Sequence, residues 1–131
     1  MPNSLTISAE PGQLYILVTG SGLWTPDQVE THFRKLDGDL RVVRRRAGVA
    51  RVLVDLGKAK VQTAEAAERM HHWTARIYRA GDQVAVICET ALLAMQIKHQ
   101  AKIYNRRIFP DREAAMAWLL SDTAPRVAES A

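Results

Sequence analysis

Arg51-Val52-Leu53-Val54-Asp55-Leu56 is the stretch that decides the fold of this 131-residue chain. Its apolar residues form a nearly continuous run, which is typical of a strand buried on both faces of a parallel sheet. Val84-Ala85-Val86-Ile87-Cys88 is a second run of the same kind. We therefore expect the two runs to form adjacent parallel strands that bury Val52, Val54, Val84 and Val86.

Helical patterns lie before, between and after these two strands. Thr25 and Pro26 suit the cap and first position of a helix over about residues 26–46. One apolar face is predicted there by spacings of four, three, four and three residues: Val29, Phe33, Leu36, Leu40 and Val43. Further helices are expected from Thr63, over 91–102, and from Pro110.

The ends of the chain complete the pattern. Ser4–Ser8 alternates like an edge strand, and Leu14–Gly20 reads as a buried strand ended by Gly20-Ser21-Gly22. A turn at residues 10–13 would join them as a hairpin. With a last strand at 105–109, the sequence predicts an α/β domain over residues 1–121. Its mostly parallel sheet has about five strands, one of them an N-terminal antiparallel strand, and about four helices. Residues 122–131 are expected to form a flexible tail.

The composition excludes several classes of protein. Hydrophobic residues make up 47% and charged residues 24%, which excludes a wholly disordered chain. No apolar run approaches the roughly 20 residues that span a bilayer, and residues 1–10 lack the pattern of a secretory signal. Cys88 is the single cysteine, so we expect no internal disulfide and a cytoplasmic location.

The formal net charge is +4, and the basic residues cluster. Residues 34–51 hold seven basic side chains against two acidic ones. Arg41, Arg44, Arg45 and Arg46 fall at the end of the first predicted helix, where the helix dipole favours cations, so we expect a solvated face. Nucleic-acid binding is not expected, because no aromatic platform accompanies the arginines.

Three segments, taken in order, resemble the bacterial STAS superfamily, in the SpoIIAA-like branch named after the sporulation anti-anti-sigma factor. They are 14–20, 51–56 and the ending Arg107–Leu119 with its aromatic, acidic-alanine and Trp-Leu pattern. The resemblance covers about residues 4–120 and implies a binding module. A related fold is that of the CRAL-TRIO lipid carriers.

The signalling members of that branch carry a phosphorylatable serine at the start of a helix. The matching stretch here is Gln62-Thr63-Ala64-Glu65, in which the serine is missing and Thr63 is the hydroxyl nearby. A phosphorylation switch needs a hydroxyl that can take the dianionic charge. We therefore expect no such switch in this chain.

Three motifs invite a chemical interpretation. Gly20-Ser21-Gly22-Leu23-Trp24 lacks the third glycine or the lysine of phosphate-binding loops, so it is predicted to be a strand-to-helix turn. His71 and His72 are adjacent and point about 100° apart on a helix, so no metal site is expected. Cys88 continues an apolar run and is predicted to be a buried thiol rather than a nucleophile.

Three functions remain open, of which an enzyme ranks last because the sequence offers no convergent set of acid, base and nucleophile. The first is a non-enzymatic interaction or regulatory module without a cofactor and with a protein partner. The alternative is a carrier of a small ligand or lipid, with a pocket at the carboxyl ends of the strands. The candidate ligand-binding residues are Trp24, Gly57, Lys58, Thr63 and Thr90.

A homodimer is also expected. The strand that carries Leu5 and Ile7 would lie at a sheet edge, and exposed edges invite pairing with another copy. The second helix offers another route, since His71, Thr74 and Tyr78 flank its apolar stripe and would face a neighbour.

Overall fold

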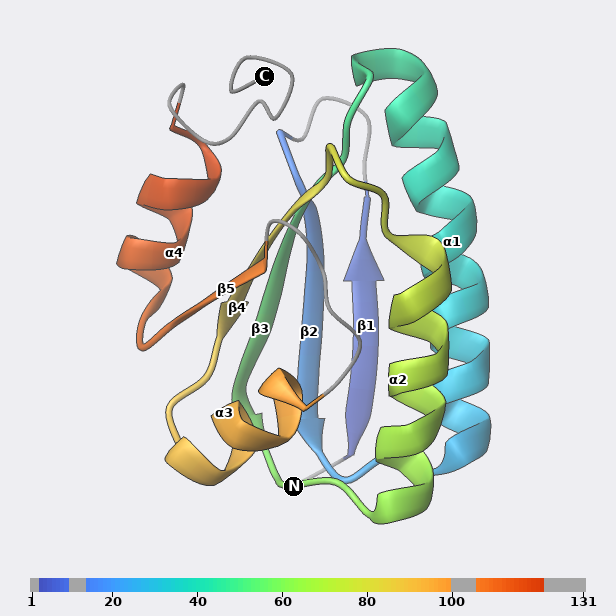
Figure 1. Cartoon of the computed structure of the whole chain (residues 1–131), viewed down its shortest axis with the longest axis vertical. Helices are drawn as coiled ribbons and strands as arrows, with labels where there is room; N and C mark the ends of the chain where they lie inside the picture. Colours follow the sequence, from blue (N-terminus) through green and yellow to red (C-terminus); the bar gives the residue numbers. More distant parts are fainter. Residues whose placement is uncertain (1–2, 10–13, 100–105, 122–131) are drawn as a thin grey trace.

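A five-stranded sheet forms the centre of the molecule in the computed structural model, which describes residues 3–9, 14–99 and 106–121 (Figure 1). The strands lie in chain order: β1 (Ser4–Ser8), β2 (Ile16–Gly22), β3 (Arg51–Ala59), β4 (Gln83–Ile87) and β5 (Arg106–Phe109). β1 is antiparallel to β2, and the other neighbours are parallel. This arrangement confirms the predicted fold class.

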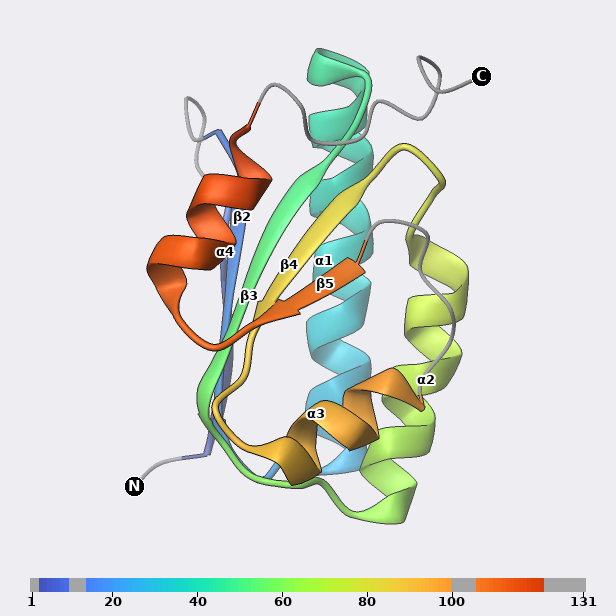
Figure 2. The same ribbon diagram turned by 60° about the vertical axis from the view of Figure 1, so that its left-hand side comes forward.

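The helices cover the two faces unequally (Figure 2). α1 (Pro26–Ala47), α2 (Ala64–Ile77) and α3 (Ala91–Lys98) lie on one face, and α4 (Arg112–Leu119) packs against β3, β4 and β5 on the other. The core is accordingly divided into a large cluster under the three helices and a small one under α4. No helix in the described ranges is both long and apolar enough to cross a membrane.

The central strands pair as the apolar runs predict. Val52 lies opposite Val84 and Val54 opposite Val86, in parallel register. Three of these valines are buried, whereas Val54 is half-buried.

α1 begins where the sequence predicts. The Thr25 hydroxyl accepts a hydrogen bond from the Gln28 amide (3.1 Å), and the Gln28 side chain accepts one from the Thr25 amide (2.9 Å). This reciprocal pair satisfies two amides that the helix itself leaves free. The helix ends at Gly48, whose φ of 85° favours glycine.

Two predicted strand ends were wrong. β2 starts at Ile16 and continues through Gly22, so Gly20-Ser21-Gly22 is part of the strand. β3 likewise continues past Gly57 to Ala59. The reason is pairing: Ser21 lies between Ser4 on one side and Lys58 on the other, which extends the sheet beyond the apolar runs. The predicted turn at 10–13, residues 100–105 and the predicted tail at 122–131 lie outside the described residues.

The expectation of a solvated arginine cluster was wrong at Arg44. Its side chain is 12% exposed and pairs with Asp82, which is 1% exposed. The Asp82 carboxylate also accepts hydrogen bonds from the amides of Ala50 (3.0 Å) and Arg79 (2.9 Å). Arg44 thus joins α1 to the segment between α2 and β4, while Arg45 and Arg46 are exposed.

Candidate functional site

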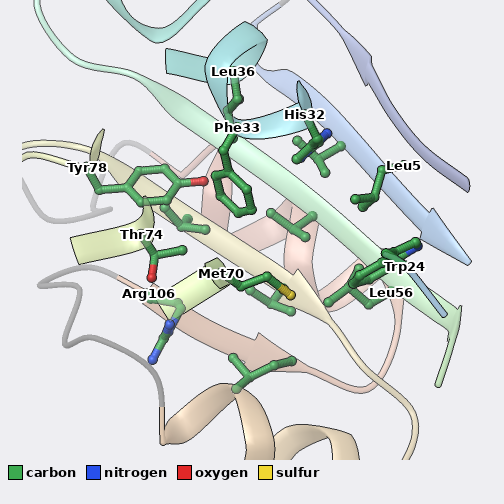
Figure 3. A pocket seen from close by; sticks show the side chains of 15 residues that line it. Leu5, Trp24, His32, Phe33, Leu36, Leu56, Met70, Thr74, Tyr78 and Arg106 are labelled. Carbon is green, nitrogen blue, oxygen red and sulfur yellow. The ribbon is translucent and has the colours of Figure 1, made fainter. Parts of the chain in front are cut away.

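An apolar cavity of about 60 Å³ lies between the sheet and the helices α1 and α2 (Figure 3). Its floor is the face of the sheet that α1, α2 and α3 cover, and its walls are side chains of α1 and α2. The lining residues are Leu5, Val18, Trp24, His32, Phe33, Leu36, Val54, Leu56, Met70, Thr74, Tyr78, Val84, Val86, Ile97 and Arg106. Most of them are aliphatic or aromatic, which is typical of a ligand pocket.

α2 packs alongside α1, and side chains of both helices border the cavity. Trp73 of α2 stacks on Phe33 of α1 with ring centroids 6.3 Å apart, and its indole N–H donates to Glu30 Oε2 at 3.0 Å. Arg69 of α2 also pairs with Glu30 (2.6 Å). These contacts hold the two helices together and leave solvent access to Val54 in the floor.

Trp24 closes the end of the cavity near the carboxyl ends of β2 and β3. It is 3% exposed, and its indole N–H donates to the carbonyls of Ser4 (2.8 Å) and Ser21 (3.0 Å). Its amide donates to Gln62 Oε1 (2.9 Å). Gly20 is needed beneath the ring, because a Cβ there would stand 2.5 Å from Trp24.

Gln62 fixes the surroundings of this end. The Gln62 side chain donates to the carbonyls of Gly22 (2.9 Å) and Lys60 (2.6 Å), so all of its polar atoms are used. Its backbone exchanges two hydrogen bonds with the Gln96 side chain of α3, at 2.8 and 2.9 Å. The start of α2 and the middle of α3 are thereby tied to the same end of the sheet.

The opposite end of the cavity is polar. Figure 3 shows Tyr78, Thr74 and Arg106 there, at the far side of the cavity from Trp24. The Thr74 hydroxyl donates to the His71 carbonyl (3.1 Å). Burial raises the pKa of the Tyr78 phenol well above its ordinary value, so the hydroxyl remains protonated. Burial lowers the pKa of the Arg106 guanidinium, which still stays charged.

His32 contributes a neutral ring to the wall. It is 8% exposed, and its ring meets Phe33 edge-on with centroids 5.0 Å apart. Burial lowers the pKa of His32 to about 4, so the imidazole is uncharged at pH 7. Arg106 is therefore the one formal charge among the described residues that line the cavity.

Among the predicted site residues, Trp24 lies in the cavity wall. Gly57 and Lys58 lie nearby, at the carboxyl end of β3. The Gly57 amide donates to Asp55 Oδ1 (3.0 Å), and Lys58 is exposed in β3 opposite Ser21. The cavity reaches the carboxyl ends of the strands at Trp24 and then runs under α1 and α2 toward Arg106. Ligand binding by Gly57 and Lys58 stays a prediction.

The two predicted threonines cap helices. The Thr63 hydroxyl accepts from the Ala66 amide (3.2 Å) at the start of α2, and the Thr90 hydroxyl accepts from the Leu93 amide (3.3 Å) at the start of α3. Neither lies among the residues that line the cavity. Their hydroxyls satisfy backbone amides at helix starts, as threonine caps do.

The cysteine and the histidine pair that the sequence singled out make ordinary structural contacts. The Cys88 thiol is buried and donates to the Thr90 carbonyl (3.3 Å). His72 lies 3.2 Å from Arg76 on the exposed side of α2. Among the described residues, no three His, Cys, Asp or Glu side chains are grouped so that they would hold a metal ion.

The polar end of the cavity escaped sequence reasoning. Thr74 and Tyr78 were expected to face a second subunit, but they face the cavity instead. Arg106 falls in the last predicted strand, where its alternation with Ile108 places both residues on one face of the sheet. Tyr78 carried no such signal, because it follows the last residue of α2.

The architecture is that of an α/β domain with the SpoIIAA-like fold. A structural comparison matches an uncharacterized protein of the DUF3478 family, with a SpoIIAA-like fold, from Shewanella loihica PV-4. The TM-score is 0.58 and the sequence identity 18%, over 88% of this chain and 92% of that one. No protein-family model matches the chain, and no curated protein is a significant match. The likeness establishes the fold.

Proposed function

We propose that this domain is a non-enzymatic binding module that holds a small, mainly apolar ligand between its sheet and the helices α1 and α2. The observation that carries this proposal is the solvent access to Val54, an apolar residue in the middle strand. A core valine in that position is ordinarily covered by a helix. Here α2 packs against α1, and an apolar crevice remains above the sheet.

The dimensions of the cavity limit the ligand. About 60 Å³ is well below the roughly 300–1,000 Å³ of an ordinary ligand pocket. A longer ligand must extend through the open side or displace a lining side chain. Met70 suits that displacement, because it is half-buried and methionine adapts readily to new packing. Each CH₂ group that leaves water contributes about 0.8 kcal/mol to binding.

A second candidate function is the binding of a protein partner. Leu92 and Met95 on α3 are 70% and 55% exposed, which is unusual for large apolar side chains that lie one turn apart. We propose that any such binding is not controlled by phosphorylation at Thr63, whose hydroxyl is used as the α2 cap. High phosphate occupancy at Thr63 in peptides from native cells would contradict this.

Native mass spectrometry of protein purified from its own cells tests the ligand proposal. We expect wild-type protein to carry a small molecule as added mass. A Val54→Trp variant should lose it, because the indole fills the crevice. Val42→Trp is the matched control, since Val42 lies on the outside of α1 and is 39% exposed. Equal added mass on both variants, or none on the wild type, would contradict the proposal.

A further inference from the structure

We propose that the ligand of the cavity carries a carboxylate head group, which Arg106 and Tyr78 bind at the polar end. This inference rests on the proposed function and names the chemical class of its ligand: a small monocarboxylic acid with an apolar body.

The position of Arg106 in β5 points to this role. Successive residues of a strand face opposite sides of the sheet. Arg107 and Phe109 face α4, where the Arg107 guanidinium lies 5.7 Å from the centre of the Trp118 ring. Arg106 and Ile108 therefore face the side of the sheet that α1, α2 and α3 cover. The charged side chain of Arg106 therefore lies against the apolar cavity. Arg107, the next residue, is exposed on the opposite face of the sheet.

The charges around the cavity are unbalanced. Two arginines lie near its polar end, and Arg44 is satisfied there by Asp82 and by the Ile77 carbonyl (2.7 Å). Arg106 forms no ion pair with any residue in the described part of the chain. No acidic residue is among those that line the cavity, and His32 is neutral. A net charge of +1 remains, which matches a monoanion.

Tyr78 supplies a second donor. Its hydroxyl is protonated and has no hydrogen-bond partner among the described residues. Tyr78 and Arg106 both line the end of the cavity that lies opposite Trp24 (Figure 3). A carboxylate accepts from a guanidinium and a hydroxyl together, and both bonds are strengthened by charge. The apolar remainder of the acid would then lie over Val54 and Val86.

Calorimetric titration with three probes of equal chain length tests the inference: hexanoate, hexan-1-ol and hexylammonium. We expect hexanoate to bind most tightly. Arg106→Ala should weaken hexanoate binding about tenfold or more, since a hydrogen bond to a charged group is lost. It should change hexan-1-ol binding by less than about twofold. Tyr78→Phe should weaken hexanoate binding by about two- to tenfold.

Arg107→Ala is the matched control, because it removes the same charge from the opposite face of the same strand. It should leave hexanoate affinity within about twofold of wild type. Arg106→Gln repeats the test if the alanine variant is unfolded by circular dichroism.

The outcomes separate this inference from the proposed function. Unchanged hexanoate affinity in folded Arg106 variants, or tighter binding of hexylammonium, overturns the inference while hexan-1-ol binding upholds the cavity. Failure of all three probes to bind overturns both.

Discussion

Burial sets the protonation of the polar side chains in the cavity wall, and His32 is the clearest case. Its pKa falls from an ordinary 6.5 to about 4 because the ring is desolvated. In the unfolded chain the same ring takes up a proton near pH 6.5. Between these values unfolding binds a proton, so acid destabilises the fold through His32.

The free energy of unfolding should therefore fall as the pH is lowered from about 6.5 to 4, and His32 should account for up to about 3 kcal/mol of the loss. Above pH 6.5 its contribution is constant. Urea unfolding at a series of pH values measures this. His32→Gln should show a shallower pH dependence than wild type, whereas His71→Gln, at an exposed position, should not. Identical slopes in all three proteins would contradict the assignment.

Asp82 shows a different use of a buried charge. Replacing it by alanine leaves Arg44 and two backbone amides without their acceptor. We expect Asp82→Ala to lower the free energy of unfolding by about 3–5 kcal/mol, the usual effect of breaking a buried pair.

Asp39→Ala is the control for Asp82→Ala. Asp39 pairs with Lys35 (2.9 Å) on an exposed face of α1, and such a pair contributes less than about 1 kcal/mol. Chemical denaturation of both variants checks the difference. Equal effects of the two substitutions would show that the Arg44–Asp82 pair has no special role.

At the scale of helices and strands, patterning in the sequence was sufficient to predict which segments form them. The stripe from Val29 to Leu40 is buried as the helical period requires. Strand ends were less predictable, because pairing with Ser4 and Lys58 extends β2 and β3 beyond the apolar runs. Local sequence carries little information about pairing partners that lie far along the chain.

Two glycines differ in what surrounds them, and they should respond oppositely to substitution. Gly38 lies inside α1 with open space around it, so Gly38→Ala should raise the free energy of unfolding by about 0.5–1 kcal/mol. Gly20 lies under Trp24, and an added Cβ would also stand 2.9 Å from Leu56. Gly20→Ala should therefore lower the free energy of unfolding by about 1–3 kcal/mol.

Thermal unfolding, with near-ultraviolet circular dichroism to follow Trp24, measures both glycine variants. Stabilisation by Gly20→Ala would mean that the Trp24 ring is not packed on β2.

At the scale of the whole molecule, the fold was predictable and the site was only partly so. Trp24 was a candidate because it follows a strand, and it lies in the cavity wall. Phe33 was expected in the core. Arg106 and Tyr78 come together only when β5 lies beside β4 and α2 leans on α1, which is a tertiary arrangement that no local pattern encodes.

The sheet order also bears on self-association. β1 is an edge strand without charges or proline, the usual protections against pairing. We expect a homodimer that pairs β1 with its copy, and a Thr6→Lys change at this edge should weaken it. Light scattering over a dilution series measures the mass. A monomer at all concentrations up to high micromolar would end this proposal.

The proposed function requires that an apolar ligand binds between the sheet and the helices α1 and α2. The most direct test is a titration with hexan-1-ol, followed by methyl NMR. We expect saturable shifts for Leu36, Val54 and Val86, which line the cavity, and none for Leu53 and Leu119, which are buried under α4. Shifts confined to Leu53 and Leu119, or to exposed Leu92, would contradict it.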